Sequence, residues 1–143
     1  MGSYADDALF MSRNNIEYVE LISDDGKSKV MVIPAWQGRV MTTSAAGDEG
    51  DSYGWINYSF IKKRQIDLQF NPVGGEERFW LGPEGGVFSL YFRQGEKQIY
   101  KNWKVPPVLD IEAFKIQSQS KNCICLTKEG CLTNACGTTF YLN

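Results

Sequence analysis

The sequence contains no histidine in 143 residues. This absence excludes any site in this chain that uses an imidazole as metal ligand, general acid or general base. The sequence also lacks the run of about 20 apolar residues that a membrane-spanning helix needs, and its start lacks the basic and apolar regions of an export signal. We therefore expect no membrane partner. The location stays open between the cytoplasm and, if a leader has been removed, the periplasm.

Positive charge is not in excess, because the chain has 15 Lys and Arg residues and 17 Asp and Glu residues, which gives a net charge of -2. Nucleic acid binding relies on clustered Lys and Arg that neutralise phosphates. The one basic run, Lys62–Arg64, is interpreted as a solvated turn or strand end. We expect no nucleic acid partner.

The four cysteines are confined to one short stretch, as Cys123, Cys125, Cys131 and Cys136. Structural zinc sites normally show two C-x-x-C pairs, or Cys with His, and neither pattern is present. Small buried thiols in a reducing compartment are the better interpretation. The sequence thus predicts neither a metal nor a cofactor.

Composition is ordinary for a globular protein, with 43% hydrophobic and 22% charged residues. A chain of this length can bury roughly two thirds of its unfolded surface. No internal repeat, low-complexity stretch or linker divides it. We predict a single domain over residues 1–143.

The first third of the chain indicates one short helix followed by strands. Residues Tyr4–Asn14 fit a short helix or an irregular arm. A hairpin is predicted from Ile16–Ile22 and Lys29–Ile33, which flank the turn residues Asp24–Gly26. A third strand is expected at Arg39–Ser44.

Later segments also favour strands. Val87–Phe92 is rich in aromatic and β-branched residues on both faces, which predicts a central strand. Further strands are expected at Ile111–Ser118, Cys123–Thr127 and Thr138–Leu142. Many short strands with turn signals indicate an all-β, antiparallel fold. The apolar last strand would form an unpaired edge, so we expect a homo-oligomer that associates through it.

Between these regions lies a segment of unusual composition, Asn71–Gly86. Its sixteen residues include five glycines, two prolines, three glutamates, an arginine and a tryptophan. Glycine permits positive φ and close backbone approach, and proline fixes φ, so the large side chains are held on irregular backbone. Such a segment is typical of a binding loop, and a ligand with hydroxyls and an apolar ring face would suit it.

Several stretches together resemble the amino-terminal portion of a largely uncharacterised bacterial family of galactose-mutarotase-like proteins. The matching stretches are Val32–Thr42, Tyr53–Asn57, Asn71–Gly86, Trp103 and Pro106, with weaker matches at Leu132–Asn134 and Gly137–Thr138.

The resemblance implies part of a large antiparallel β-sandwich, the mutarotase-like supersandwich, because that family usually exceeds twice this length. It also implies a carbohydrate-binding or carbohydrate-processing protein. Mutarotases typically use a His acid and a Glu base, and the base lies in a late segment that this chain does not reach. Catalysis by this chain alone is therefore not expected. The alternative function is a non-catalytic assembly module whose exposed sheet edge pairs with a partner.

Candidate ligand-binding residues follow from the glycine-rich segment. By local order, the resemblance matches Arg78 to the sugar-binding arginine of mutarotases, and Glu84 stands where their His-Gly-Gly stretch has an imidazole. A planar guanidinium can grip vicinal hydroxyls, although Arg78 could instead pair with Glu76, Glu77 or Glu84 to fix the loop. We add Asn71 and Arg39 to the candidate set.

The glutamates of this segment are also candidates for catalysis and for cation binding. Glu84 with either Glu76 or Glu77 is the candidate acid/base pair, with Glu84 and Glu77 as the catalytic candidates, and the three carboxylates could instead bind a hard cation such as Ca²⁺. Glu76 and Glu77 would point to opposite faces of an extended backbone, so they are not expected to act together.

The four tryptophans are candidates for sugar stacking or for the core. Trp80, inside the glycine-rich segment, is the best candidate to stack on a sugar ring. Burial in the core is the commoner outcome for it, and more so for Trp36, Trp55 and Trp103.

Overall fold

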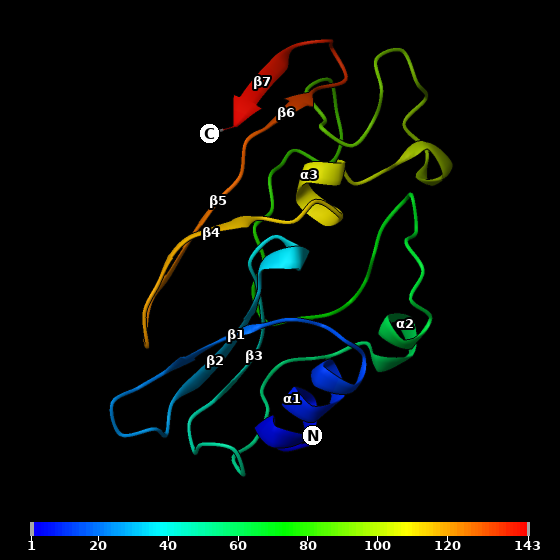
Figure 1. The fold of residues 1–143 in the computed structure, drawn as a ribbon. Coiled ribbons are helices and arrows are strands. Elements are labelled where there is room, and N and C mark those ends of the chain that lie inside the picture. The colour runs from blue at the N-terminus through cyan, green and yellow to red at the C-terminus, as the bar shows by residue number, and fades with distance from the viewer. Residues whose placement is uncertain (1, 143) are drawn as a thin grey trace.

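The computed structural model describes residues 2–142, which form short strands and a few helices (Figure 1). Strands account for 26% of the structure and helices for 18%. The strands pair only in antiparallel fashion, in one three-stranded and two two-stranded sheets. The all-β prediction is thus confirmed at this level.

The amino-terminal helix α1 spans Tyr4–Arg13. Ser3 begins it with a capping box, in which its hydroxyl accepts from the backbone of Asp6 while the Asp6 carboxylate accepts from the backbone of Ser3. Tyr4, Asp7 and Met11 are buried and lie three and four residues apart, so they share one helix face. The predicted short helix is confirmed, and the arm alternative is not.

The main sheet contains β1 (Val19–Ile22), β2 (Lys29–Ile33) and β3 (Arg39–Ser44), in that order. A register shift between Met31 and Val32 marks a bulge in the β2–β3 pair. The 3₁₀ helix η1, Pro34–Trp36, joins β2 to β3. The hairpin and the third strand are confirmed.

A first hydrophobic cluster packs α1 and a later short helix against this sheet. Its buried members are Tyr4, Met11, Met31, Ile33, Met41, Ile56, Ile61 and Val73. Ile61 belongs to α2, Tyr58–Lys62, which the sequence pattern did not predict because it is only about one turn long. Lys62–Arg64 is exposed at its end, as the solvated-turn interpretation requires.

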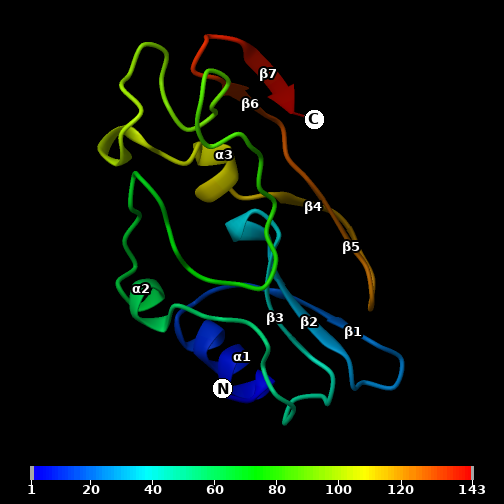
Figure 2. The ribbon, with the colours of Figure 1, turned by 180° about the vertical axis from the view of Figure 1, so that it is seen from behind.

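The rest of the chain holds two single-turn helices and two hairpins. The helices are the 3₁₀ helix η2 (Tyr100–Asn102) and α3 (Pro107–Asp110), and the first hairpin consists of β4 (Lys115–Gln119) and β5 (Ile124–Thr127). The tip of the β4–β5 hairpin reaches back to the first sheet, where the Ile22 backbone N–H donates to the carbonyl of Lys121 at 2.8 Å (Figure 2).

The second hairpin consists of β6 (Gly130–Thr133) and β7 (Thr139–Leu142). β6 was not predicted, whereas β4, β5 and β7 agree with predicted strands except at their ends. A second hydrophobic cluster lies beneath this hairpin and α3. Its buried members are Tyr91, Phe92, Val105, Val108, Leu109 and Leu132.

The predicted central strand at Val87–Phe92 is wrong, because this segment consists of turns and bends. Ser89 explains the difference: its hydroxyl donates to the carbonyl of Glu84 at 2.8 Å and accepts from the backbone of Tyr91 at 3.1 Å. These local bonds satisfy the backbone without a strand partner. The aromatic residues are then divided, with Phe92 buried and Phe88 64% exposed.

Two burial predictions are also wrong. All four cysteines are exposed. Cys125 and Cys131 lie on strands of two-stranded hairpins with an open face, and Cys123 and Cys136 lie just outside those strands. Trp55 is 64% exposed rather than in the core, since it precedes α2 on an irregular segment. Trp36, Trp80 and Trp103 are half-buried against the two clusters. Over residues 2–142, no helix has the length and apolar character to cross a membrane.

Candidate functional site

The buried carboxylate of Asp110, at the end of α3, organises the candidate residues. Asp110 Oδ2 accepts from the backbone N–H of Asn71 at 2.9 Å and from the Asn71 side-chain amide at 2.7 Å. Asp110 Oδ1 lies 3.4 Å from the guanidinium of Arg78, which also donates to the carbonyl of Leu109. Arg78 therefore pairs with Asp110, and the predicted alternative of a pair with Glu76, Glu77 or Glu84 is wrong.

Sequence reasoning missed Asp110. It lies 39 residues from Asn71 and outside the glycine-rich segment, directly after the apolar Val108 and Leu109. An acidic residue that follows two buried apolar residues in a one-turn helix is the only signal, and it does not identify the partner.

Arg39 is 3% exposed and lies near enough to Arg78 to feel its charge. Its guanidinium donates to the carbonyl of Gly74 at 2.6 Å, while its Nε has no partner within residues 2–142. Burial, with a contribution from the nearby Arg78 charge, lowers the pKa of Arg39 to about 10. Burial also lowers the pKa of Arg78, although Asp110 opposes the shift. Two guanidinium groups thus lie near one buried carboxylate.

Glycine at position 74 makes this arrangement feasible. Its φ is +98°, and a Cβ there would lie 2.1 Å from the backbone oxygen of Trp55. The neighbouring Gly75 N–H donates to the same Trp55 oxygen at 2.8 Å. Only a residue without a side chain permits the two segments to approach this closely, which places the Gly74 carbonyl at Arg39.

Trp80 connects the buried cluster to the surface. The Arg78 guanidinium carbon is 4.2 Å from the centroid of the Trp80 ring. On its polar edge, Trp80 Nε1 donates to Glu84 Oε1 at 2.9 Å. The indole therefore contacts a cation on its face and holds a carboxylate at its edge.

Glu84 lines an open groove of about 560 Å³, together with Gln98, Tyr100 and Trp103. Trp103 stacks on Tyr100 with ring centroids 6.3 Å apart and an interplanar angle of 12°. Its ring also stacks on the buried Tyr91, at 5.5 Å and 7°. The Gln98 amide donates to and accepts from the backbone of Gly86, at 2.7 and 2.8 Å, so it fixes the loop that carries Glu84.

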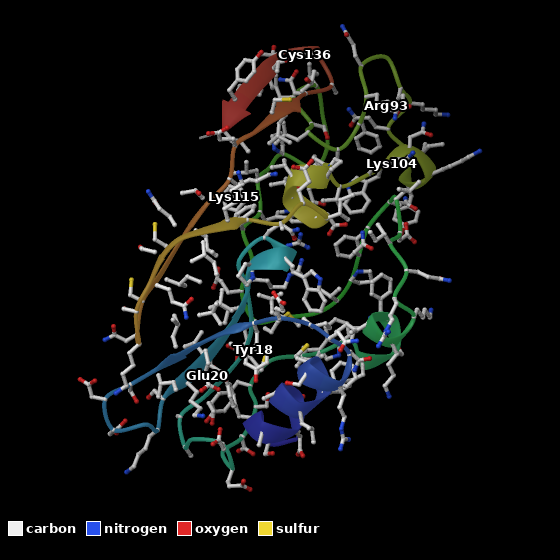
Figure 3. All side chains as sticks on the ribbon, in the orientation of Figure 1. Tyr18, Glu20, Arg93, Lys104, Lys115 and Cys136 are labelled. Carbon is white, nitrogen blue, oxygen red and sulfur yellow. The ribbon has the colours of Figure 1, made fainter. Side chains whose placement is uncertain are left out.

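Two further hollows adjoin Asp110. One, of about 240 Å³, is formed by residues from both halves of the chain, among them Trp36, Phe60 and Arg64. The other is open and measures about 650 Å³, and its lining residues include Arg93 and Lys104, which are labelled in Figure 3. In the larger hollow Arg93, Lys101 and Lys104 are matched by Asp67, Glu96 and Asp110, so the charges of its lining balance.

A family model described as a family of unknown function (DUF6786) matches residues 2–143. The chain belongs to the DUF6786 family. No curated protein matches the chain, and no solved structure does.

In this DUF6786 member, the predicted site residues divide into three groups: those at the groove, those in the buried cluster around Asp110, and Glu77, which lies apart from both. Glu84 lines the groove, and Trp80, which is not one of the lining residues, donates a hydrogen bond to its carboxylate. Arg39, Asn71 and Arg78 lie in the buried cluster around Asp110.

Glu77 is exposed and belongs to a different neighbourhood of the DUF6786 chain. Its backbone carbonyl accepts from Val40 on β3, and the adjacent Glu76 accepts from Thr43 on the same strand. Glu84 instead bonds to Trp80. Within residues 2–142, no three His, Cys, Asp or Glu side chains gather as a metal-binding group.

Proposed function

We propose that the protein binds carbohydrate in the groove formed by Glu84, Gln98, Tyr100 and Trp103. The observation that carries this proposal is the pairing of an exposed aromatic face with a fixed carboxylate. Tyr100 is 78% exposed and stacks on Trp103, so its outer face is supported from behind. The apolar face of a pyranose stacks on such a ring, and its hydroxyls donate to a carboxylate beside it.

The geometry of Glu84 supports this function. Its Oε1 already accepts a hydrogen bond from Trp80, which leaves Oε2 to accept from a ligand hydroxyl. The indole restricts the carboxylate before the ligand arrives, and this lowers the entropy that binding would otherwise lose.

We propose binding without catalysis by this chain, since the imidazole acid that mutarotases use is absent. The resemblance to galactose-mutarotase-like proteins supports carbohydrate as the ligand class. On the same resemblance, we propose that the antiparallel sheets correspond to part of a larger β-sandwich. The ligand-binding role proposed for Arg78, Asn71 and Arg39 becomes indirect, because none of the three lines the groove.

The test is a titration of the purified chain with a panel of neutral mono- and oligosaccharides, followed by NMR chemical shifts of the Tyr100 and Trp103 backbone amides. We expect Tyr100→Ala and Glu84→Gln each to weaken binding about tenfold, as the loss of one good contact predicts. Tyr141→Ala is the control, because Tyr141 is equally exposed, at 80%, and lies outside the groove. Saturable binding that survives both groove variants would contradict the proposal, as would the absence of binding to every sugar.

A second candidate function is assembly through the edge of β7. One edge of this strand pairs with β6, and no other strand within residues 2–142 pairs with it. Phe140 is 47% exposed and Tyr141 80% exposed on this strand, which leaves apolar surface beside open backbone groups. Light scattering over a range of concentrations tests the idea: Phe140→Lys should shift an oligomer to monomer, and a monomeric parent protein would reject it.

A further inference from the structure

The smaller hollow, of about 240 Å³, is a second site distinct from the groove. It shares no lining residue with the groove. Its walls are mainly apolar and come from segments far apart in the sequence, including Trp36 at the end of η1, Phe60 and Ile61 on α2, and Val73. At about 30 Å³ for each water, its volume corresponds to about eight water molecules, enough for a small ring compound.

The end of α2 places Arg64 at this cavity. Lys63 is the C-cap of α2, and Arg64 follows it with a φ of 51°. Positive φ is common directly after a helix, so this conformation is part of the ordinary end of α2. Arg64 is thereby held among the lining residues.

The cavity lining holds one carboxylate and one cation, and only the carboxylate is paired. Among the described lining residues Asp110 is the only carboxylate, and it is already bonded to Asn71 and Arg78. Arg64 is the only lining cation, and within residues 2–142 it forms no ion pair. Because Arg64 is exposed and lines the cavity, it lies at the opening, where its free guanidinium can meet an anion.

We propose that this cavity binds a small organic acid, with an apolar ring among Trp36, Phe60 and Ile61 and a carboxylate paired to Arg64. A planar guanidinium pairs with a carboxylate through two parallel hydrogen bonds, which fixes the orientation of the ligand. The apolar walls then take up the ring, which gains from leaving water. A neutral ring compound of the same size would keep the apolar contact of the ring and lose the pairing of the carboxylate with Arg64.

Benzoate and benzyl alcohol are the matched probes, because they share a ring and differ in charge. Each is titrated into the full chain, and binding is followed by tryptophan fluorescence and by the NMR shifts of the Trp36 and Arg64 amides. We expect benzoate to bind at least tenfold more tightly than benzyl alcohol, as a charge-assisted hydrogen bond predicts. Equal affinity for the two probes, or the binding of neither, would overturn the proposal.

Two variants locate the interaction. Arg64→Gln should reduce benzoate affinity to that of benzyl alcohol, while Lys63→Gln removes the same charge from a neighbour that does not line the cavity. Both side chains are exposed, so neither change should prevent folding, which the melting temperature checks. An unchanged benzoate affinity in Arg64→Gln, or an equal loss in Lys63→Gln, would overturn the assignment to Arg64.

Discussion

The guanidinium of Arg78 lies 4.2 Å from the centroid of the Trp80 ring while it also bonds to the buried Asp110. One cation thereby joins the internal polar cluster to the indole that holds Glu84 in the groove. This relationship assigns different roles to residues that the sequence placed in one site. Arg78 packs on the face of Trp80, and in the proposed carbohydrate site Glu84 is the residue that would face the ligand.

The indole N–H of Trp80 can be tested without removal of its ring. In Trp80→Phe the aromatic contact with Arg78 persists but the 2.9 Å bond to Glu84 is lost. We expect carbohydrate affinity to fall about fivefold, the effect of one hydrogen bond of about 1 kcal/mol, with a small change in melting temperature. Calorimetric titration measures the affinity. Trp55→Phe, an exposed tryptophan elsewhere, serves as control, and an equal loss in both variants would contradict the role of the indole.

Asp110→Ala should cause a large loss of stability. It removes the acceptor for two Asn71 N–H groups and leaves the half-buried Arg78 without its counter-charge. Breaking a buried pair in this way typically costs about 3 kcal/mol in the free energy of unfolding. Urea denaturation measures it. The matched control is Glu77→Ala, an exposed carboxylate, for which we expect less than about 0.5 kcal/mol; similar losses in the two variants would refute the central position of Asp110.

Gly74→Ala should destabilise the protein by about 2 kcal/mol or more, because the added Cβ would lie 2.1 Å from the Trp55 oxygen at a φ of +98°. Gly85→Ala in the same segment is the control, since the nearest atom to its added Cβ lies 3.8 Å away. Thermal unfolding of both variants provides the comparison. Two equally stable variants would show that the close approach at Gly74 is not required.

Alkaline pH should destabilise the protein through its tyrosines. Burial, together with a hydrogen bond to Asp7, raises the pKa of Tyr58 from 10.0 to about 12. Between these values the unfolded chain loses its tyrosine proton while the folded protein keeps it, so the free energy of unfolding falls as pH rises. Burial raises the pKa of Tyr4 and Tyr91 in the same direction.

The measurement is urea denaturation between pH 9 and pH 11, in the parent protein and in Tyr58→Phe. The variant should lose less stability over this interval because it lacks one of the shifted groups. Tyr141→Phe is the control, since its side chain is 80% exposed. A pH dependence identical in the parent and Tyr58→Phe would contradict the raised pKa.

Local sequence pattern predicted the first sheet and the amino-terminal helix, because the spacing of apolar residues and the turn residues act over a few positions. It failed at Val87–Phe92, where aromatic content suits a buried irregular segment as well as a strand, and Ser89 decides between them. It also failed for the cysteines, because alternation does not reveal whether a hairpin has a second layer above it.

The candidate site was predictable only in part. The composition of the glycine-rich segment led to Trp80 and Glu84, which the structure joins directly. Tyr100 and Gln98 were missed because they carry no distinctive spacing and reach the groove only through tertiary structure. Asp110 was missed for the same reason, since its partners Asn71 and Arg78 are more than 30 residues away.

The two hydrophobic clusters have no residue in common, and the contacts between their regions include the polar bonds of Gln37 to Glu112 and of Asn71 to Asp110. Apolar surfaces tolerate small sliding movements, whereas hydrogen bonds weaken steeply once their angles change. The junction between the two regions therefore resists small sliding movements that a purely apolar contact would allow. It holds the two regions in one orientation and, when strained, would release abruptly instead of bending.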